Sequence, residues 1–323
     1  MQRKTQQTLM KTMAWIGVGM AAVTIFLRAW LMPSLRDAET GLFSSGKPVV
    51  ALMLLALVVL AAMGLSMPKT RWEIAKPDGV RVGAVTIFSG VVLVLCGLWD
   101  SWLWFVRRQM PAPEAASVTT LTVAALLLQV LFGIVGGVAL VRLGLLTVSE
   151  GGTRRGIAGW SMLAPVLWMW FRLARYEMSY VSTVRFSESF FNFVMFILEL
   201  LFLFKLARYT AGVGRVGAGR LEFYAAATAM FALSSPLTRV AMYLLGDSEA
   251  YLANELAGVA DVAIGILAAA VAFGLSARSA EEEAPEGKAP EGKAPEATQS
   301  AEESSETTSP VPEDDSFDFI IGE

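Results

Sequence analysis

Ionisable residues inside long apolar stretches are the residues of this sequence whose types and spacing could do chemistry. Five of them fall on five different stretches. Counted at about 1.5 Å per residue, they lie in one layer in the outer half of a membrane: Arg28, Asp100, Arg172, Arg239 and Glu255. A charged side chain at the centre of a membrane helix costs at least about 2.5–3.5 kcal/mol, so each should face protein, water or a partner. Guanidinium groups in this layer could bind a carboxylate or phosphate with two parallel hydrogen bonds. The layer therefore predicts a ligand-binding site.

A structural role competes for the same five residues. The arginines could instead pair with Asp100 and Glu255 and lock helices together, or extend to the membrane surface. Pro236 favours ligand binding, because a proline one turn before Arg239 should break its helix. Nearby hydroxyl groups could satisfy the freed carbonyls, and broken helices near the midplane often mark transporter sites. Both interpretations remain open from the sequence.

Two acidic residues are expected nearest the middle of the membrane. Glu199 and Asp261 could carry a proton or a cation and so couple binding to ion movement. Each could equally be a neutral, hydrogen-bonded packing group. Arg172 is the nearest cross-helix partner expected for Glu199, provided that the fifth and sixth stretches pack as antiparallel neighbours.

The absence of one residue type excludes several kinds of chemistry. The 323 residues include no histidine and a single cysteine, Cys96. Ser-His-Asp and Cys-His catalysis and histidine-based zinc or haem sites are therefore impossible, and one cysteine forms neither an intrachain disulfide nor a cysteine metal cluster. Residues 41–47 match GxxxxGK, but Pro48 stands where a nucleotide site needs Ser or Thr. We expect no enzyme, no cofactor, no metal site and no nucleic-acid partner.

The elements that must position these residues are long apolar helices. The chain is 55% hydrophobic, and a helix needs roughly 20 apolar residues to cross a bilayer. Eight stretches qualify: 11–32, 49–67, 83–106, 119–141, 157–176, 188–207, 221–245 and 250–277. Gly133 and Gly137 have the GxxxG spacing that lets helices approach closely, and packing inside one chain is favoured over a dimer seam. We therefore predict an all-α, polytopic integral membrane protein with its transmembrane domain at 1–278.

The lysines and arginines between these stretches predict the orientation, because cytoplasmic loops carry an excess of basic residues. With the N-terminus inside, the cytoplasmic segments hold Arg3, Lys4, Lys11, Lys69, Arg71, Lys76, Arg81, Arg154, Arg155, Lys205, Arg208, Arg215 and Arg220. The opposite loops hold only Arg36, Lys47, Arg107, Arg108 and Arg185. Both termini are therefore expected in the cytoplasm.

The C-terminal region differs from the body in charge and composition. Residues 279–323 hold 14 acidic side chains against Lys288 and Lys293, a net charge of −12, whereas residues 1–278 carry +9. Residues 279–312 are rich in Pro and Glu and predict a disordered linker. Residues 313–323 combine an acidic run with apolar side chains, which is the form of a docking peptide for a cytoplasmic partner. The docking residues would be Asp314, Asp315, Phe317, Phe319, Ile320 and Ile321; a frayed end with chance hydrophobic residues is the alternative.

Two segments carry a family resemblance. Residues 36–46, which follow the first stretch, resemble a D-x-x-G-L-x-x-x-G loop in uncharacterised polytopic membrane proteins of Firmicutes bacteria, in which histidine usually stands at the position of Lys47. Residues 171–212 are also similar, with a charged turn followed by an aromatic stretch. The likeness covers most of residues 10–275, and the acidic tail is not part of it. It implies a bacterial cytoplasmic membrane and brings no established activity or site residues.

Two functions are consistent with these residues. The first is membrane-embedded binding or transport of a small anionic or zwitterionic solute, with the arginine layer as binding site and with Glu199 and Asp261 for coupling. The second is a non-catalytic accessory or scaffold subunit whose tail recruits a cytoplasmic partner.

Overall fold

The structure, a computed structural model, describes eight segments of the chain. They are residues 3–35, 47–66, 79–109, 120–149, 160–178, 186–211, 218–245 and 255–281. Within them every regular element is an α-helix: α1 (Arg3–Leu35), α2 (Lys47–Ser66), α3 (Gly79–Gln109), α4 (Thr120–Ser149), α6 (Leu163–Met178), α7 (Phe186–Ala211), α8 (Ala218–Leu244) and α9 (Glu255–Glu281). The predicted all-helical fold is confirmed for this part of the chain, and each predicted apolar stretch overlaps one helix.

The chain divides into two units, residues 1–284 and 285–323. The second unit lies wholly outside the described residues, as does most of the predicted linker. The predicted docking residues 313–323 therefore lie outside the described residues. The segment 36–46, which carries part of the family resemblance, also lies outside them.

Five of the helices are long and apolar enough to cross a membrane. Their apolar parts are Thr8–Trp30 in α1, Val49–Ser66 in α2, Val80–Leu103 in α3, Val123–Ser149 in α4 and Gly258–Leu275 in α9. Each holds at least 18 residues, near the roughly 20 needed to span the hydrocarbon core.

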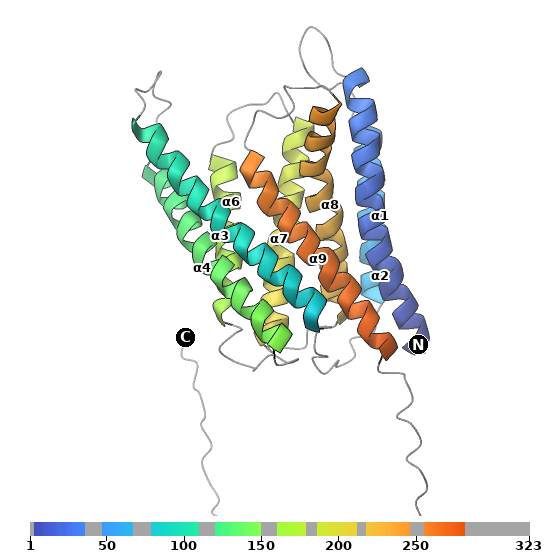
Figure 1. Cartoon of the computed structure of the whole chain (residues 1–323). Helices are drawn as coiled ribbons and strands as arrows, with labels where there is room; N and C mark the ends of the chain where they lie inside the picture. The colour runs from blue at the N-terminus through green and yellow to red at the C-terminus, as the bar shows by residue number, and fades with distance from the viewer. Residues whose placement is uncertain are drawn as a thin grey trace, which may run out of the picture. The chain divides into compact units, whose positions relative to one another are not determined.

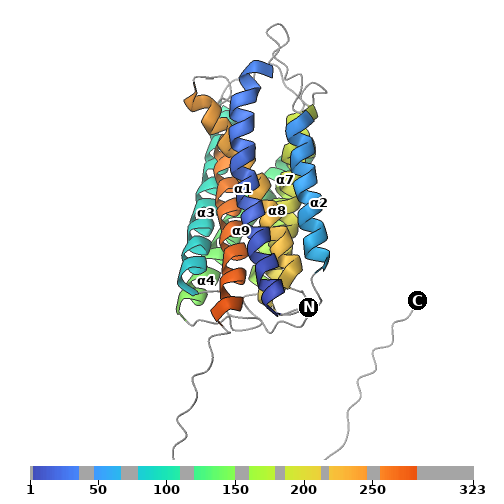
Figure 2. The ribbon, with the colours of Figure 1, turned by 90° about the vertical axis from the view of Figure 1, so that its right-hand side faces the viewer.

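Consecutive helices run in alternating directions along one bundle (Figures 1 and 2). As a result, the start of α1 and the end of α9 lie at the same end. We call this the N-terminal end of the bundle, and the end where α1 stops at Leu35 the opposite end.

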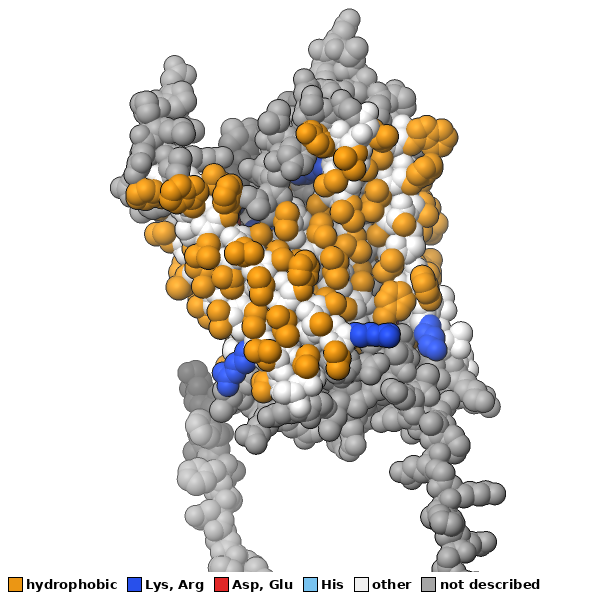
Figure 3. All heavy atoms as spheres, viewed as in Figure 1, with side chains coloured by type: hydrophobic (Ala, Val, Ile, Leu, Met, Phe, Trp, Pro, Cys, Tyr) orange, Lys and Arg blue, Asp and Glu red, His pale blue; other side chains and the backbone are white. Residues whose placement is uncertain are grey.

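The surface of the bundle is apolar across its middle. On the face in Figure 3, hydrophobic side chains form a continuous band, with Lys and Arg side chains at its lower edge and others, partly covered, near its upper edge. Aromatic and aliphatic residues that are more than half exposed include Trp15, Trp30, Leu55, Trp102 and Trp160. Exposed apolar area on this scale is typical of a surface that contacts lipid or another protein.

Helix α8 lies at the centre of the bundle. It packs against α1, α2, α7 and α9. The middle of α8 is rich in alanine, whose small side chain lets neighbouring helices cover it on every side. Small side chains allow close approach: a Cβ atom added at Gly17 of α1 would lie 2.5 Å from the Ala226 carbonyl oxygen of α8. Helices α3 and α4 approach closely for the same reason: a Cβ atom added at Gly90 would lie 2.6 Å from the Gly137 carbonyl oxygen.

The GxxxG pair lies inside the packing of this chain. Gly137 faces Gly90 of α3, and a Cβ at Gly133 would lie 2.9 Å from the Trp168 ring of α6. Both glycines are therefore used within one bundle, as the sequence interpretation favoured.

One sequence expectation was wrong. Pro236 does not break its helix, because α8 continues from Ala218 to Leu244 with the proline inside it. Neighbouring hydroxyls hydrogen-bond locally instead: Ser234 donates to the Phe231 carbonyl at 3.1 Å and Thr238 to the Ser234 carbonyl at 2.6 Å. Ser235 donates to Asn192 Oδ1 of α7 at 3.0 Å. Support from these groups and from neighbouring helices explains why a proline is tolerated here.

The α1–α8 contact yields a stability prediction with an internal control. Gly17→Ala should lower the unfolding free energy by about 1–3 kcal/mol, because the new methyl group meets backbone that cannot rotate away. Gly19→Ala, two residues along α1 with nothing within 4 Å of its added Cβ, should leave stability unchanged or slightly higher, since alanine favours helix over glycine. Tryptophan fluorescence during thermal unfolding in detergent measures both. Equal shifts in the two variants would contradict the close α1–α8 approach.

Candidate functional site

Three helices bring ionisable side chains together in the interior of the bundle. Arg172 comes from α6, Glu199 from α7 and Asp261 from α9, and all three are buried. We call these residues the Arg172 cluster. Cross-helix hydrogen bonds fix the backbone next to two of them: Thr228 of α8 donates to the Leu198 carbonyl at 3.0 Å, and Ser89 of α3 donates to the Ala263 carbonyl at 2.9 Å.

Arg172 and Asp261 form a bidentate ion pair. The Arg172 Nη2 atom donates to Asp261 Oδ2 at 2.9 Å, and Nη1 donates to the second carboxylate oxygen. Glu199 Oε2 lies 3.9 Å from the same Nη1 atom. One guanidinium thus faces two carboxyl groups, and the Glu199 side chain is entirely removed from solvent.

Aromatic rings complete the surroundings of the guanidinium. The Arg172 Cζ atom lies 4.6 Å from the centroid of the Phe196 ring and 5.3 Å from that of Trp168. Tyr176 packs edge-on against Phe196 with centroids 5.2 Å apart. Aromatic faces attract cations and exclude water, so the charge of Arg172 is balanced by protein groups.

Helices α3 and α4 add a second set of polar groups beside the cluster. Gln129 Nε2 of α4 donates to Asp100 Oδ2 of α3 at 3.2 Å. The cations whose charges act on Asp100 are Arg175 and Arg172. Cys96 lies one turn before Asp100 on α3. It is close enough to Asp100, Arg172 and Asp261 to interact electrostatically with all three.

The four residues of the predicted layer whose side chains the structure describes do not form one cluster. Arg172 forms its bidentate ion pair with Asp261, whereas the Asp100 carboxylate accepts a hydrogen bond from Gln129. The Arg172 guanidinium therefore lies as deep as the two acidic groups expected at mid-membrane. Depth counted along the backbone misses this because an arginine side chain extends several ångströms from its Cα atom. The expected Glu199–Arg172 proximity is found, at 3.9 Å.

The other arginines of the layer lie elsewhere. Arg28 is buried with its guanidinium 4.8 Å from the Phe191 ring centroid, and Phe191 is about 12 Å along α7 from Glu199. Gly258 of α9 faces Pro236 of α8, so Arg239 lies about 9 Å along the bundle from Asp261. The Glu255 side chain lies outside what the structure describes.

One buried carboxyl group, that of Glu222, was not among the site residues predicted from the sequence. Glu222 of α8 is fully buried, and neither of its carboxyl oxygens has a hydrogen-bond partner within the described segments. It lies one turn before Ala226, on the helix face that meets α1. The alanine-rich, apolar run from Ala225 to Ala232 was the available signal, since a helix that is apolar all round is buried.

The donor set defines what this site can do. Among the described residues no group of three or more His, Cys, Asp or Glu side chains is arranged to hold a metal ion. The Arg172 cluster carries a net charge of −1 with both carboxyl groups ionised and is neutral with one proton. It can therefore hold a proton, or exchange a carboxylate on the guanidinium.

Comparisons with protein-family models, with curated proteins and with solved structures find no match to this chain.

The ion pair yields a prediction of non-additive stability. Arg172→Gln and Asp261→Asn should each destabilise the bundle by about 3–5 kcal/mol. The first variant leaves Asp261 without its cation, and the second leaves Arg172 with only Glu199, at 3.9 Å, as counter-ion. The double variant should cost less than the sum of the two. Chemical unfolding in mixed micelles measures all three, with Arg142→Gln on the exposed side of α4 as a control that should change little. Additive losses would show that the two side chains do not depend on each other.

Proposed function

We propose that the helical body spans the bacterial cytoplasmic membrane with eight helices and with both termini in the cytoplasm. The alternation of helix directions and the shared end of α1 and α9 support an even number of crossings. Basic residues in the terminal turns at the N-terminal end support the orientation, because basic residues are retained in the cytoplasm. They include Arg81, Arg208 and Arg220.

We further propose that this body binds or transports a small anionic or zwitterionic solute and that the Arg172 cluster couples the solute to a proton. One observation carries this: a buried guanidinium shared by two carboxyl groups, Asp261 in bidentate contact and Glu199 at 3.9 Å. A net charge of −1 in an apolar interior is unfavourable, and one proton on the carboxyl pair removes it.

The cluster offers a direct exchange. A carboxylate on the solute would replace Asp261 on the Arg172 guanidinium, which binds such groups with two parallel hydrogen bonds. Asp261 would then lack a cation and would accept a proton from water, so that one anionic group and one proton are bound together. Release of the solute would return Asp261 to Arg172 and its proton to water. The exchange requires the α6–α9 contact to open, in the manner of alternating access.

The second candidate is an accessory or scaffold subunit that recruits a cytoplasmic protein through residues 313–323. The acidic run followed by two phenylalanines and two isoleucines supports it, as charge would steer the partner and apolar groups would anchor it. In this alternative the Arg172 cluster only holds α6, α7 and α9 together.

Proton movement separates the two functions. We expect the full chain in proteoliposomes, with a pH-sensitive dye inside, to give a pH change on addition of one or more members of a panel of small carboxylates, amino acids and phosphate. Asp261→Asn keeps the shape of the side chain but cannot take up a proton, and should reduce the signal to background. Glu177→Gln, exposed near the end of α6, should keep it.

Two results would contradict coupling through the cluster. A signal that survives in Asp261→Asn would exclude this residue as the proton acceptor of the exchange. A wild-type protein without a signal for any solute of the panel would favour the scaffold alternative.

A further inference from the structure

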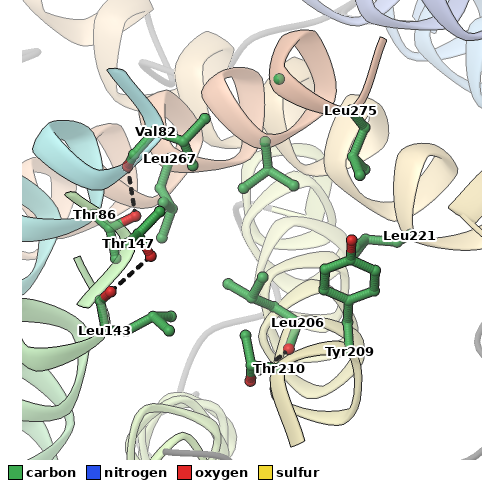
Figure 4. Close-up of a pocket in the computed structure, with 12 residues that line it drawn as sticks. Val82, Thr86, Leu143, Thr147, Leu206, Tyr209, Thr210, Leu221, Leu267 and Leu275 are labelled. Carbon is green, nitrogen blue, oxygen red and sulfur yellow. Dashed lines mark hydrogen bonds between the residues drawn. The ribbon is translucent and has the colours of Figure 1, made fainter. Parts of the chain in front are cut away.

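A pocket at the N-terminal end of the bundle is lined by residues of α3, α4, α7, α8 and α9; Figure 4 shows these side chains. It is a narrow cavity, with about 50 Å³ open to the centre of a water-sized sphere. Its walls come from the first turns of α3 and α8, the last turns of α4 and α7, and the second half of α9. The walls include Val82, Leu143, Leu206, Leu221, Leu267 and Val271.

The pocket offers few polar groups to a ligand. Three threonines face it, yet each hydroxyl donates to a carbonyl of its own helix: Thr86 to Val82 at 2.7 Å, Thr147 to Leu143 at 2.7 Å and Thr210 to Leu206 at 3.0 Å. Their methyl groups add to the aliphatic lining. A hydrocarbon chain fits this environment, whereas a polar solute would lose its hydrogen bonds with water.

A basic group lies beside the pocket. Lys205 is one turn before the pocket residue Tyr209 on α7, and Arg220 directly precedes the pocket residue Leu221 on α8. The Lys205 Nζ atom lies 5.7 Å from the Tyr224 ring centroid of α8. The charges of Arg208 and Arg220 both act on Lys205, and within the described segments none of these three cations has an ion-pair partner. Three cations that repel one another next to an apolar pocket favour an anionic amphiphile.

We propose that the pocket holds one acyl chain of an anionic phospholipid, with its phosphate on Lys205, Arg208 and Arg220. The inference rests on the proposed membrane location, where the N-terminal end meets the anionic cytoplasmic leaflet. It is separate from the Arg172 cluster, because Leu206 lies about 10 Å along α7 from Glu199 and Leu267 about 9 Å along α9 from Asp261. Since α7 and α9 carry residues of both sites, a bound lipid braces two of the three helices that must move for exchange at Arg172.

Native mass spectrometry of the full chain in detergent tests the headgroup and the acyl chain separately. The probes are phosphatidylglycerol, phosphatidylcholine and inorganic phosphate. Phosphatidylglycerol should bind as one tightly held molecule, phosphatidylcholine more weakly, and inorganic phosphate should not displace the lipid. The double variant Lys205→Gln/Arg208→Gln should weaken phosphatidylglycerol binding by roughly fivefold for each charge removed. Lys11→Gln, exposed at the same end on α1, is the matched control.

A second pair of variants tests the pocket itself. Val271→Phe fills it from α9 and should weaken binding by more than tenfold, since each CH₂ group kept out of an apolar site lowers affinity about fourfold. Val259→Phe on the same helix is the control, because Val259 is 48% exposed and lies away from the pocket. Thermal unfolding of each variant shows whether it is folded, and the charge variants carry the test if Val271→Phe is not.

Several outcomes would overturn the inference. They are equal binding of phosphatidylcholine, displacement by inorganic phosphate, or unchanged binding in Val271→Phe. Much tighter lipid binding to a chain that ends at Pro312 would instead assign the pocket to residues 313–323. Resistance to carbonate extraction from membranes is measured in parallel for the wild-type chain and every variant. A wild-type chain that is inserted but binds no phosphatidylglycerol contradicts this inference alone, because the proposed membrane location then still holds.

Discussion

A buried guanidinium group sets the main constraint on this bundle. Arginine does not lose its proton in a protein, and an isolated charge in an apolar interior costs several kcal/mol. Arg172 must therefore be surrounded by anions and by the faces of aromatic rings. Asp261 supplies a bidentate carboxylate, Glu199 a second carboxyl group and Phe196 a ring face. Helices α6, α7 and α9 must meet at this height for the chain to fold.

The remaining helices make that meeting possible. Alanines along α8 let α9 and α1 approach closely, as the Gly17–Ala226 contact shows. The glycine contact between α3 and α4 brings Asp100 and Gln129 beside the cluster, and Ser89 of α3 fixes α9 two residues after Asp261. The cluster is thus held by hydrogen bonds and close packing from most of the bundle, and a solute that replaces Asp261 on Arg172 would act on several helices at once.

The sequence predicted the helices better than the contacts between them. Apolar length alone places eight stretches that overlap the eight helices of the described residues, because hydrophobic length depends on local composition. Side-chain partners depend on helix rotation and register, which apolar stretches do not encode. Arg172 was therefore expected in a layer above Asp261, and Glu222 was not selected although it is fully buried. Pro236 shows a further reason. A proline is expected to break a helix, yet α8 continues through it, beside a hydrogen bond from Ser235 to Asn192 of the neighbouring helix α7.

The central claim is that the Arg172 cluster holds one proton on its two carboxyl groups. Infrared spectroscopy of hydrated lipid films measures this directly, because a protonated carboxyl group has a carbonyl stretch that is separate from the carboxylate bands. We predict a protonated-acid band at neutral pH that disappears in Glu199→Gln or Asp261→Asn. Glu222→Gln serves as reference, since Glu222 is a second fully buried carboxyl group and its band should be lost independently. An unchanged spectrum in both cluster variants would show that Glu199 and Asp261 are both ionised, and would contradict the proposed proton site.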